Sequence, residues 1–198
     1  MENKLMTLEK LRRYKVWLQR MGCSRGFGVQ SPSAYSFVRY VINEHYPYYA
    51  YEELLGEYPE ISVITRRKAE FLFRLSNFLQ YEYCYMGGDS ESCFSTYISY
   101  GCRKTIIRSF NVGMNAPDAA LYILSQKDVD LNDFSDFIDC LPDNSVIFIN
   151  GLLKEERTKA VWNIMMQHKR ISFSFDMYYC GVAFMNPKTP KQNFKINF

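Results

Sequence analysis

The residues of this chain that could do chemistry begin with a glycine turn, MGGDSES, which follows the aromatic run YEYCYM at residues 81–86. Gly87 and Gly88 have no side chain, so the backbone there can approach a ligand closely. The carboxylates Asp89 and Glu91 stand two residues apart and could form an acid–base pair. They could instead cap the helix that follows, because negative charge is favourable at a helix N-terminus. We favour capping. The glycine pair is by itself a weak signal for a ligand site, because two glycines after a strand also occur in ordinary turns.

Other titratable side chains are scattered along the chain. Asp176 lies inside the apolar run ISFSFDMYY, and a carboxylate among aromatic neighbours must be paired or reach solvent. We expect it to be structural. His45 and His168 are the only two histidines, and His168 ends a helical pattern, where a cation is favourable. The six cysteines form no CxxC pair, so we expect no metal site and reduced thiols.

A second candidate segment, CSRGFGVQSP at residues 23–32, mixes an arginine, an aromatic ring and glycines before a helix start. A helix N-terminus there would favour an anion. The alternative is a tight turn between two helices, in which Phe27 packs as a hydrophobic staple. The sequence leaves both interpretations open.

Composition sets limits on the class of protein. With 198 residues, of which 47 % are apolar, the chain has the size of one domain with a helical extension. Its net charge of +3 is too small to indicate nucleic acid by itself. Residues 1–28 hold seven basic and two acidic residues, which we interpret as a solvated helix face, with contact to RNA as the less favoured alternative. No run resembles a signal peptide or a membrane span, so we expect a cytoplasmic protein without a membrane partner.

The elements that must position these residues divide the chain in two. Residues 1–80 have helical patterns, with Ser31 as N-cap and Pro32 at the first position of one helix. From residue 81 strands alternate with helices, which predicts a mostly parallel sheet. Strands are expected at 81–86 and 103–110, both buried, at 143–150, and at 170–179, 181–186 and 193–198, with a tight break near Gly181. Helices are expected at 90–101, 115–126, 131–141 and 153–169.

Both ends of the chain carry motifs that belong together. The N-terminal part contains GFGVQSPSAYSFVRYVI, and the C-terminal part contains a helix with Trp162, then SFDMYYCGVAF and a closing NFKINF. This combination resembles a family of bacterial class I S-adenosylmethionine-dependent methyltransferase-like proteins, in which a GVHSPF-type segment precedes the α/β domain. The resemblance is weak in the middle of the chain, where cofactor chemistry would lie.

The resemblance implies where a site would form, because class I methyltransferases bind their cofactor at the carboxyl ends of parallel strands. The implied S-adenosylmethionine-binding residues are Gly87, Gly88 and Asp89. The implied substrate-binding residues are Arg25, Phe27, Gly28 and Gln30. No catalytic residue is assigned, since methyl transfer can proceed by alignment of the reactants alone.

The chain departs from the family at each cofactor position. Residues 90–92 are Ser-Glu-Ser, where further small residues are expected, and Arg108 and Ser109 replace the acid after the second strand. Residues 150–153, Asn-Gly-Leu-Leu, replace an Asp-Asp-x-His pattern. The stretch 111–145 is short, so we expect one strand to be missing there. These departures predict an eroded cofactor site.

The expected fold is α/β: a class I methyltransferase-like, Rossmann-like, mostly parallel sheet with antiparallel C-terminal edge strands, preceded by an α-helical N-terminal cap. The expected domains are residues 1–65 for the cap and 66–198 for the shortened α/β domain. The leading hypothesis is a methyltransferase-like protein of unknown substrate with an eroded cofactor site, and the sequence leaves open whether it still transfers a methyl group. The alternative is a non-catalytic module that binds a partner protein or forms a homodimer on the same scaffold.

Overall fold

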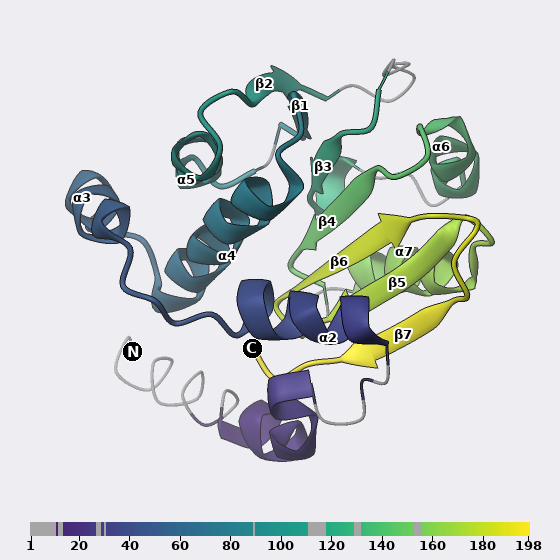
Figure 1. Ribbon diagram of the computed structural model, residues 1–198, viewed down its shortest axis with the longest axis horizontal. Helices are drawn as coiled ribbons and strands as arrows, with labels where there is room; N and C mark the ends of the chain where they lie inside the picture. Colours follow the sequence, from purple (N-terminus) through teal and green to yellow (C-terminus); the bar gives the residue numbers. More distant parts are fainter. Residues whose placement is uncertain are drawn as a thin grey trace.

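The computed structural model describes residues 11, 14–26, 29, 31–88, 90–110, 118–128, 132–152 and 156–198 (Figure 1). Its centre is one seven-stranded sheet in the order β2-β1-β3-β4-β6-β5-β7. The strands are β1 Tyr83–Met86, β2 Ile106–Ser109, β3 Leu121–Leu124, β4 Val146–Asn150, β5 Ile171–Asp176, β6 Cys180–Met185 and β7 Gln192–Lys195.

Six of these strands point the same way. β1, β2, β3 and β4 pair in parallel, β6 pairs antiparallel with both β4 and β5, and β7 pairs in parallel with β5. The sheet is therefore mostly parallel, with the antiparallel pairing supplied by the C-terminal strands, and the predicted α/β fold class is confirmed. The carboxyl ends of the six parallel strands meet at one side, which we name the carboxyl edge.

Residues 118–126, the described part of the helix expected at 115–126, do not form that helix. β3 Leu121–Leu124 lies between β1 and β4, and all four of its residues are buried. A strand covered on both faces has no alternation of polar and apolar residues, so its short apolar run resembles a buried helix segment. The short middle of the chain thus supplies a central strand, where none was expected.

The second strand is also less buried than expected. β2 Ile106–Ser109 lies at one end of the strand order, and Ile106 is 47 % exposed. An edge strand has a neighbour on one side only, so even β-branched residues there remain in contact with solvent. The predicted break at Gly181 is shifted too, because the turn consists of residues 177–179 and Tyr178 has φ of 70°.

Helices cover both faces of the sheet (Figure 1). One face carries α2 Pro32–Phe37, the π-helix η2 Val38–Ile42, α4 Val63–Leu79 and α5 Cys93–Gly101, with α3 Tyr49–Glu57 outside them. The other face carries α6 Phe134–Cys140 and α7 Glu156–Gln167. Each layer buries its own apolar cluster against the sheet, so the sheet is enclosed between two hydrophobic cores.

The local signals for helix starts are confirmed. The Ser31 hydroxyl accepts a hydrogen bond from the Ala34 amide at 3.4 Å, with Pro32 at the first helical position. The Ser62 hydroxyl accepts from the Thr65 amide at 3.1 Å and begins α4 in the same way. Such caps satisfy amide groups that have no partner within the helix.

Two arginines, Arg20 and Arg74, connect the N-terminal helices to the α/β part of the chain through hydrogen bonds. Arg20 donates to the Asp176 carboxylate at 2.9 Å, which confirms that this carboxylate is paired. Arg74, buried on α4, donates to the Val41 and Ile42 carbonyls at 2.7 and 3.4 Å, where the π-helix ends. The predicted domain boundary at residues 65 and 66 lies within α4 and stays a prediction.

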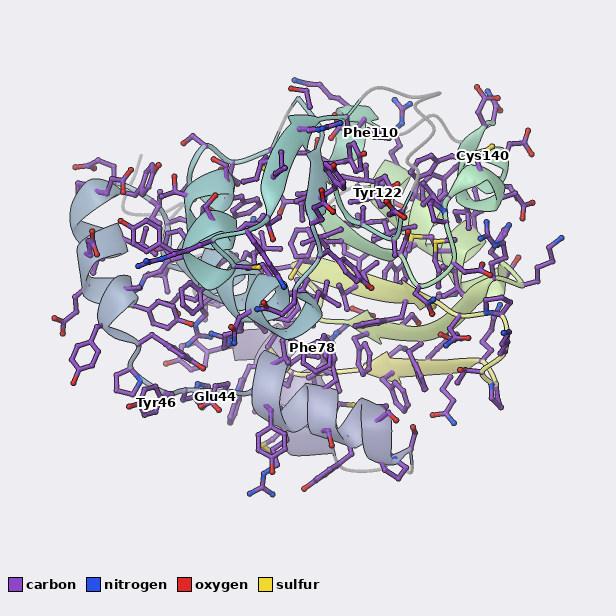
Figure 2. All side chains as sticks on the ribbon, turned by 45° about the horizontal axis from the view of Figure 1, so that its top comes forward. Glu44, Tyr46, Phe78, Phe110, Tyr122 and Cys140 are labelled. Atoms are coloured by element: carbon purple, nitrogen blue, oxygen red, sulfur yellow. The ribbon has the colours of Figure 1, made fainter. Side chains whose placement is uncertain are left out.

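Aromatic side chains fill both cores. Phe110 and Tyr122 lie beside each other on the face that α6 covers, with ring centroids 6.1 Å apart (Figure 2). On the opposite face, Tyr48 and Tyr51 each pack 5.2 Å from Phe73. Tyr48 and Tyr51 therefore pack against the core, whereas Tyr46 and Tyr49 are exposed.

Candidate functional site

The glycine turn lies at the carboxyl edge, directly after β1. The Gly87 amide donates to the Ile123 carbonyl of β3 at 2.9 Å, which continues the pairing of β1 with β3. Gly87 is buried and Gly88 is exposed, with open space around the position of a Cβ atom at Gly88. Asp89 lies outside the described residues. The turn therefore has the position that a cofactor loop requires.

The space against Gly87 is filled by the chain itself. The 3₁₀ turn η3 Gln126–Asp128 follows β3 and brings the Asp128 carboxylate onto the glycine. A Cβ atom at Gly87 would lie closer than 3.0 Å to the Asp128 carboxylate, so a methyl group would not fit. Asp128 is held there because its Oδ2 accepts from the Ser125 amide at 2.7 Å and from the Ser125 hydroxyl at 2.6 Å. The glycine is needed for this close approach of a side chain.

A buried lysine occupies the neighbouring part of the carboxyl edge. Lys68 of α4 donates to Oδ1 of Asn150, the last residue of β4, at 2.7 Å. Its Nζ also lies 3.6 Å from Glu91 and 5.6 Å from the centre of the Phe94 ring. Glu91 has Lys68 as an ion-pair partner, and the side chain of the N-cap residue Ser92 makes no capping hydrogen bond to α5. Glu91 directly precedes that N-cap residue, and stabilisation of the helix N-terminus by its charge stays a prediction.

The described residues at the end of β2 include no carboxylate that could accept hydrogen bonds from ribose hydroxyls. Arg108 and Ser109 stand there, and the Arg108 guanidinium lies over the Tyr83 ring, 4.6 Å from its centre. A guanidinium has donors only, so it cannot replace a carboxylate that accepts hydrogen bonds. Together with the filled space at Gly87 and the engaged Asn150, this arrangement does not fit an adenosyl cofactor.

The segment expected near the substrate is described only in part. Arg25 belongs to the 3₁₀ helix η1 Met21–Gly26, but its side chain lies outside the described residues, as do Phe27, Gly28 and Gln30. The Cys23 carbonyl accepts from the Asn197 amide at 3.4 Å, so this helix lies beside the chain that follows β7. β7 is five strand positions from β1, about 24 Å at the usual strand spacing. The contact of Arg25–Gln30 with a substrate stays a prediction.

Comparisons with known proteins return likeness in structure only. The chain is similar in fold to methyltransferases. No family model and no curated protein matches it. A methyltransferase from Geobacter sulfurreducens is 9 % identical over 69 % of this chain and 87 % of its own, with a TM-score of 0.47. An O-methyltransferase from Bacillus cereus, in complex with SAH, is 10 % identical over 75 % of this chain and 96 % of its own, with a TM-score of 0.44. The fold class stated above rests on the strand order of the chain itself.

Burial shifts the pKa of three further groups. Burial raises the pKa of the Cys84 thiol, and it raises the pKa of Cys180 to about 12. Thiols with such pKa values are not nucleophiles near neutral pH. His168 follows α7 as expected, but burial lowers its pKa, so it is not the helix-terminal cation that the sequence suggests.

Two absences concern the described residues alone. Within those ranges, no three His, Cys, Asp or Glu side chains come together as a set that could hold a metal ion. Among the same residues, no helix combines the length and the apolar character that crossing a bilayer requires.

Sequence reasoning missed Asp128 and Lys68. Asp128 comes two residues after the run 115–126, which the pattern assigns to a helix, and this concealed its place at the carboxyl edge. The signal for Lys68 was its position among apolar residues of a helical pattern, because a lysine there must find a partner. The partner, Asn150, is 82 residues away, and sequence alone does not pair them.

Proposed function

We propose that this chain is a methyltransferase-like protein whose S-adenosylmethionine site is eroded and which transfers no methyl group. The chain keeps the sheet and the glycine turn of such a protein. Asp128 and Asn150 at the carboxyl edge are engaged with Ser125 and Lys68, and so these groups offer no cradle for a cofactor.

One observation carries the proposal: the Asp128 carboxylate lies against Gly87. A glycine turn accepts the methionine part of an adenosyl ligand because no side chain stands in the way. In this chain the Asp128 side chain occupies that space beside Gly87, held by two hydrogen bonds from Ser125. A ligand would have to displace a charged group from its hydrogen bonds, which costs several kcal/mol.

Calorimetric titration of the whole chain with S-adenosylmethionine and S-adenosylhomocysteine tests the proposal. We expect no saturable heat with either ligand from a folded sample. A Gly88→Val variant serves as the matched probe, because open space around Gly88 lets the variant fold. Micromolar binding by the natural chain that weakens in Gly88→Val would overturn the proposal.

A second candidate is a non-catalytic module that associates with another copy of itself. Tyr14, Trp17 and Leu18 lie on one short helical stretch and are 68, 50 and 61 % exposed. Large apolar side chains gathered in this way are typical of interaction surfaces. Light scattering would show twice the monomer mass, and Leu18→Glu would return the mass to that of a monomer.

A further inference from the structure

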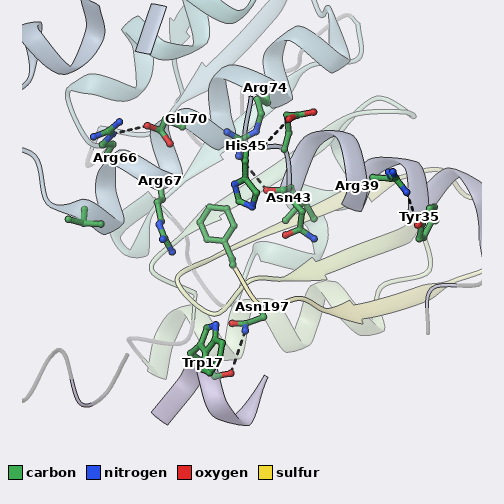
Figure 3. A pocket seen from close by; sticks show the side chains of 14 residues that line it. Trp17, Tyr35, Arg39, Asn43, His45, Arg66, Arg67, Glu70, Arg74 and Asn197 are labelled. Atoms are coloured by element: carbon green, nitrogen blue, oxygen red, sulfur yellow. Dashed lines mark hydrogen bonds and ion pairs between the residues drawn. The ribbon is translucent and has the colours of Figure 1, made fainter. Parts of the chain in front are cut away.

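A cavity of about 850 Å³ opens at the carboxyl edge (Figure 3). It lies between the first turns of α4, the loop after the π-helix and the end of the chain. A second cavity of about 570 Å³ adjoins it and shares Trp17, Arg67, Asn197 and Phe198 with it. Cavities of this size hold small organic molecules.

The charged groups of the larger cavity leave an excess of positive charge. Its side chains include four arginines and two glutamates, which is an excess of two. Glu70 is paired with Arg66 at 2.7 Å, and Glu44 accepts hydrogen bonds at 2.8 Å from the amides of His45 and Tyr46. Both carboxylates are therefore engaged before a ligand arrives.

The arginines differ in how much of their hydrogen-bonding capacity is free. Arg74 is buried and spends its donors on carbonyls and on the Tyr51 hydroxyl. Arg39 makes one bond, to the Tyr35 hydroxyl at 3.3 Å. Arg67 is exposed, and within the described ranges it makes no hydrogen bond or ion pair. The guanidinium of Arg67 is thus the available anion-binding group.

Flat side chains line the same space. In Figure 3, Arg67 and His45 descend from the upper side of the cavity, and Trp17 and Asn197 close it from below. Trp17 is half-exposed, and the Phe198 ring is fixed by an edge-on contact with the buried Phe71, at 5.9 Å. A ring placed between such walls gains from stacking.

We propose that this cavity binds a small oxyanion that carries a flat ring, with its phosphate or carboxylate on Arg67 and its ring against Trp17 and Phe198. Arginine suits both anions, because its planar fork donates two parallel hydrogen bonds to either. The proposal does not depend on the glycine turn, because neither Gly87 nor Gly88 lines the cavity. Loss of S-adenosylmethionine binding in Gly88→Val would report on the glycine turn, whereas loss of binding of the ring-bearing anion in Arg67→Met reports on this cavity.

NMR titration of the 15N-labelled chain provides the test. The probes are phenyl phosphate and benzoate, with inorganic phosphate and benzyl alcohol as the anion without a ring and the ring without an anion. We expect one or both ring-bearing anions to bind more tightly than the two controls. Which of the two binds better identifies the oxyanion that the cavity selects.

Two variants and a control separate the contributions. Arg67→Met should weaken binding of the ring-bearing anion about tenfold, the worth of one charged hydrogen bond. Trp17→Ala should remove most of the advantage of phenyl phosphate over inorganic phosphate. Arg103→Met, an exposed arginine in the turn before β2, should leave binding unchanged.

Three results would overturn the proposal. The first is no saturable change with either ring-bearing anion. The second is benzyl alcohol binding as tightly as benzoate and phenyl phosphate. The third is equal weakening in Arg67→Met and Arg103→Met, which would mean that only the overall charge attracts the probes.

Discussion

The contact between Asp128 and Gly87 is the residue-scale feature on which the proposed loss of the cofactor site depends. Gly87→Ala would drive a methyl group into the carboxylate, and we expect it to lower the free energy of unfolding by about 1–3 kcal/mol. Asp128→Ala should relieve that clash, so the double variant should be more stable than the sum of the two single changes. Urea unfolding of the four proteins measures this coupling.

Gly88→Ala is the matched control for this cycle. A Cβ atom at Gly88 meets nothing within 4 Å, so we expect a change within about 0.5 kcal/mol. Additive effects of Gly87→Ala and Asp128→Ala would show that the carboxylate does not lie on the glycine in solution.

His168 makes stability depend on pH. Burial is the largest cause of its lowered pKa, although Asp139 raises that pKa and Lys169 and Arg170 lower it. Because the folded pKa lies below the ordinary value of 6.5, the unfolded chain binds more protons as the solution becomes acidic. This contribution is complete above pH 6.5 and is lost as pH falls from there toward the folded pKa.

We therefore expect the free energy of unfolding to fall as the pH drops below about 6.5, and His168→Gln to reduce that fall. Asp139→Asn should steepen it, because it removes the neighbour that raises the pKa of His168. Urea unfolding at several pH values measures these slopes. Identical slopes in the natural chain and in His168→Gln would contradict the expectation.

At the scale of elements, α4 and α5 approach each other closely at one glycine. A Cβ atom at Gly101 would lie closer than 3.0 Å to the Phe73 carbonyl and to the Ser76 hydroxyl. That hydroxyl also donates to the Ile98 carbonyl at 2.8 Å, so moving it away from an added methyl group would break this hydrogen bond. Gly101→Ala should cost about 1–3 kcal/mol of stability, measured by thermal unfolding.

Gly56→Ala on α3 is the control, because a Cβ atom there meets nothing within 4 Å. It should leave stability unchanged or raise it by up to about 1 kcal/mol, since alanine restricts the unfolded chain. If both changes had the same effect, the close packing of α4 on α5 would be refuted.

Elements were predictable from the sequence where a local signal decides them. Ser31 and Pro32 mark a helix start whatever surrounds them, and the run at residues 143–150 has the β-branched composition of a strand. The run LYIL at residues 121–124 has leucines and a tyrosine, which suit either structure. Its strand conformation depends on pairing with β1 and β4, so tertiary contacts decide it.

The candidate site was predictable only as a position. The order of elements placed Gly87 and Gly88 after β1, and the replaced acids indicated an eroded site. Neither Asp128 nor Lys68 was predicted, because each contacts a residue that is far away in the sequence, Gly87 and Asn150 respectively. Local patterns locate an edge of a sheet but do not show which side chains fill it.

For the whole molecule, the ion pair between Arg20 and Asp176 joins the first described helix to the end of β5. The two side chains are 11 and 9 % exposed, and Arg20 also donates to the Asp176 and Ile196 carbonyls at 2.9 and 3.3 Å. Removing one partner of a buried pair leaves an unpaired charge, which costs about 3–5 kcal/mol. Arg20→Met should therefore loosen the N-terminal helices before it affects the sheet.

Hydrogen exchange read by mass spectrometry distinguishes this outcome from global destabilisation. In Arg20→Met, peptides from residues 14–26 should lose protection, whereas peptides that contain β3 and β4 should keep it. Lys159→Met is the control, because Lys159 pairs with the largely exposed Glu156, and such pairs contribute about 0–1 kcal/mol. A uniform loss of protection in Arg20→Met would mean that the N-terminal helices and the sheet unfold as one unit. Loss confined to residues 14–26 would mean that the helices can separate from a sheet that stays folded, and that this one ion pair governs the wall of the cavity beside Trp17.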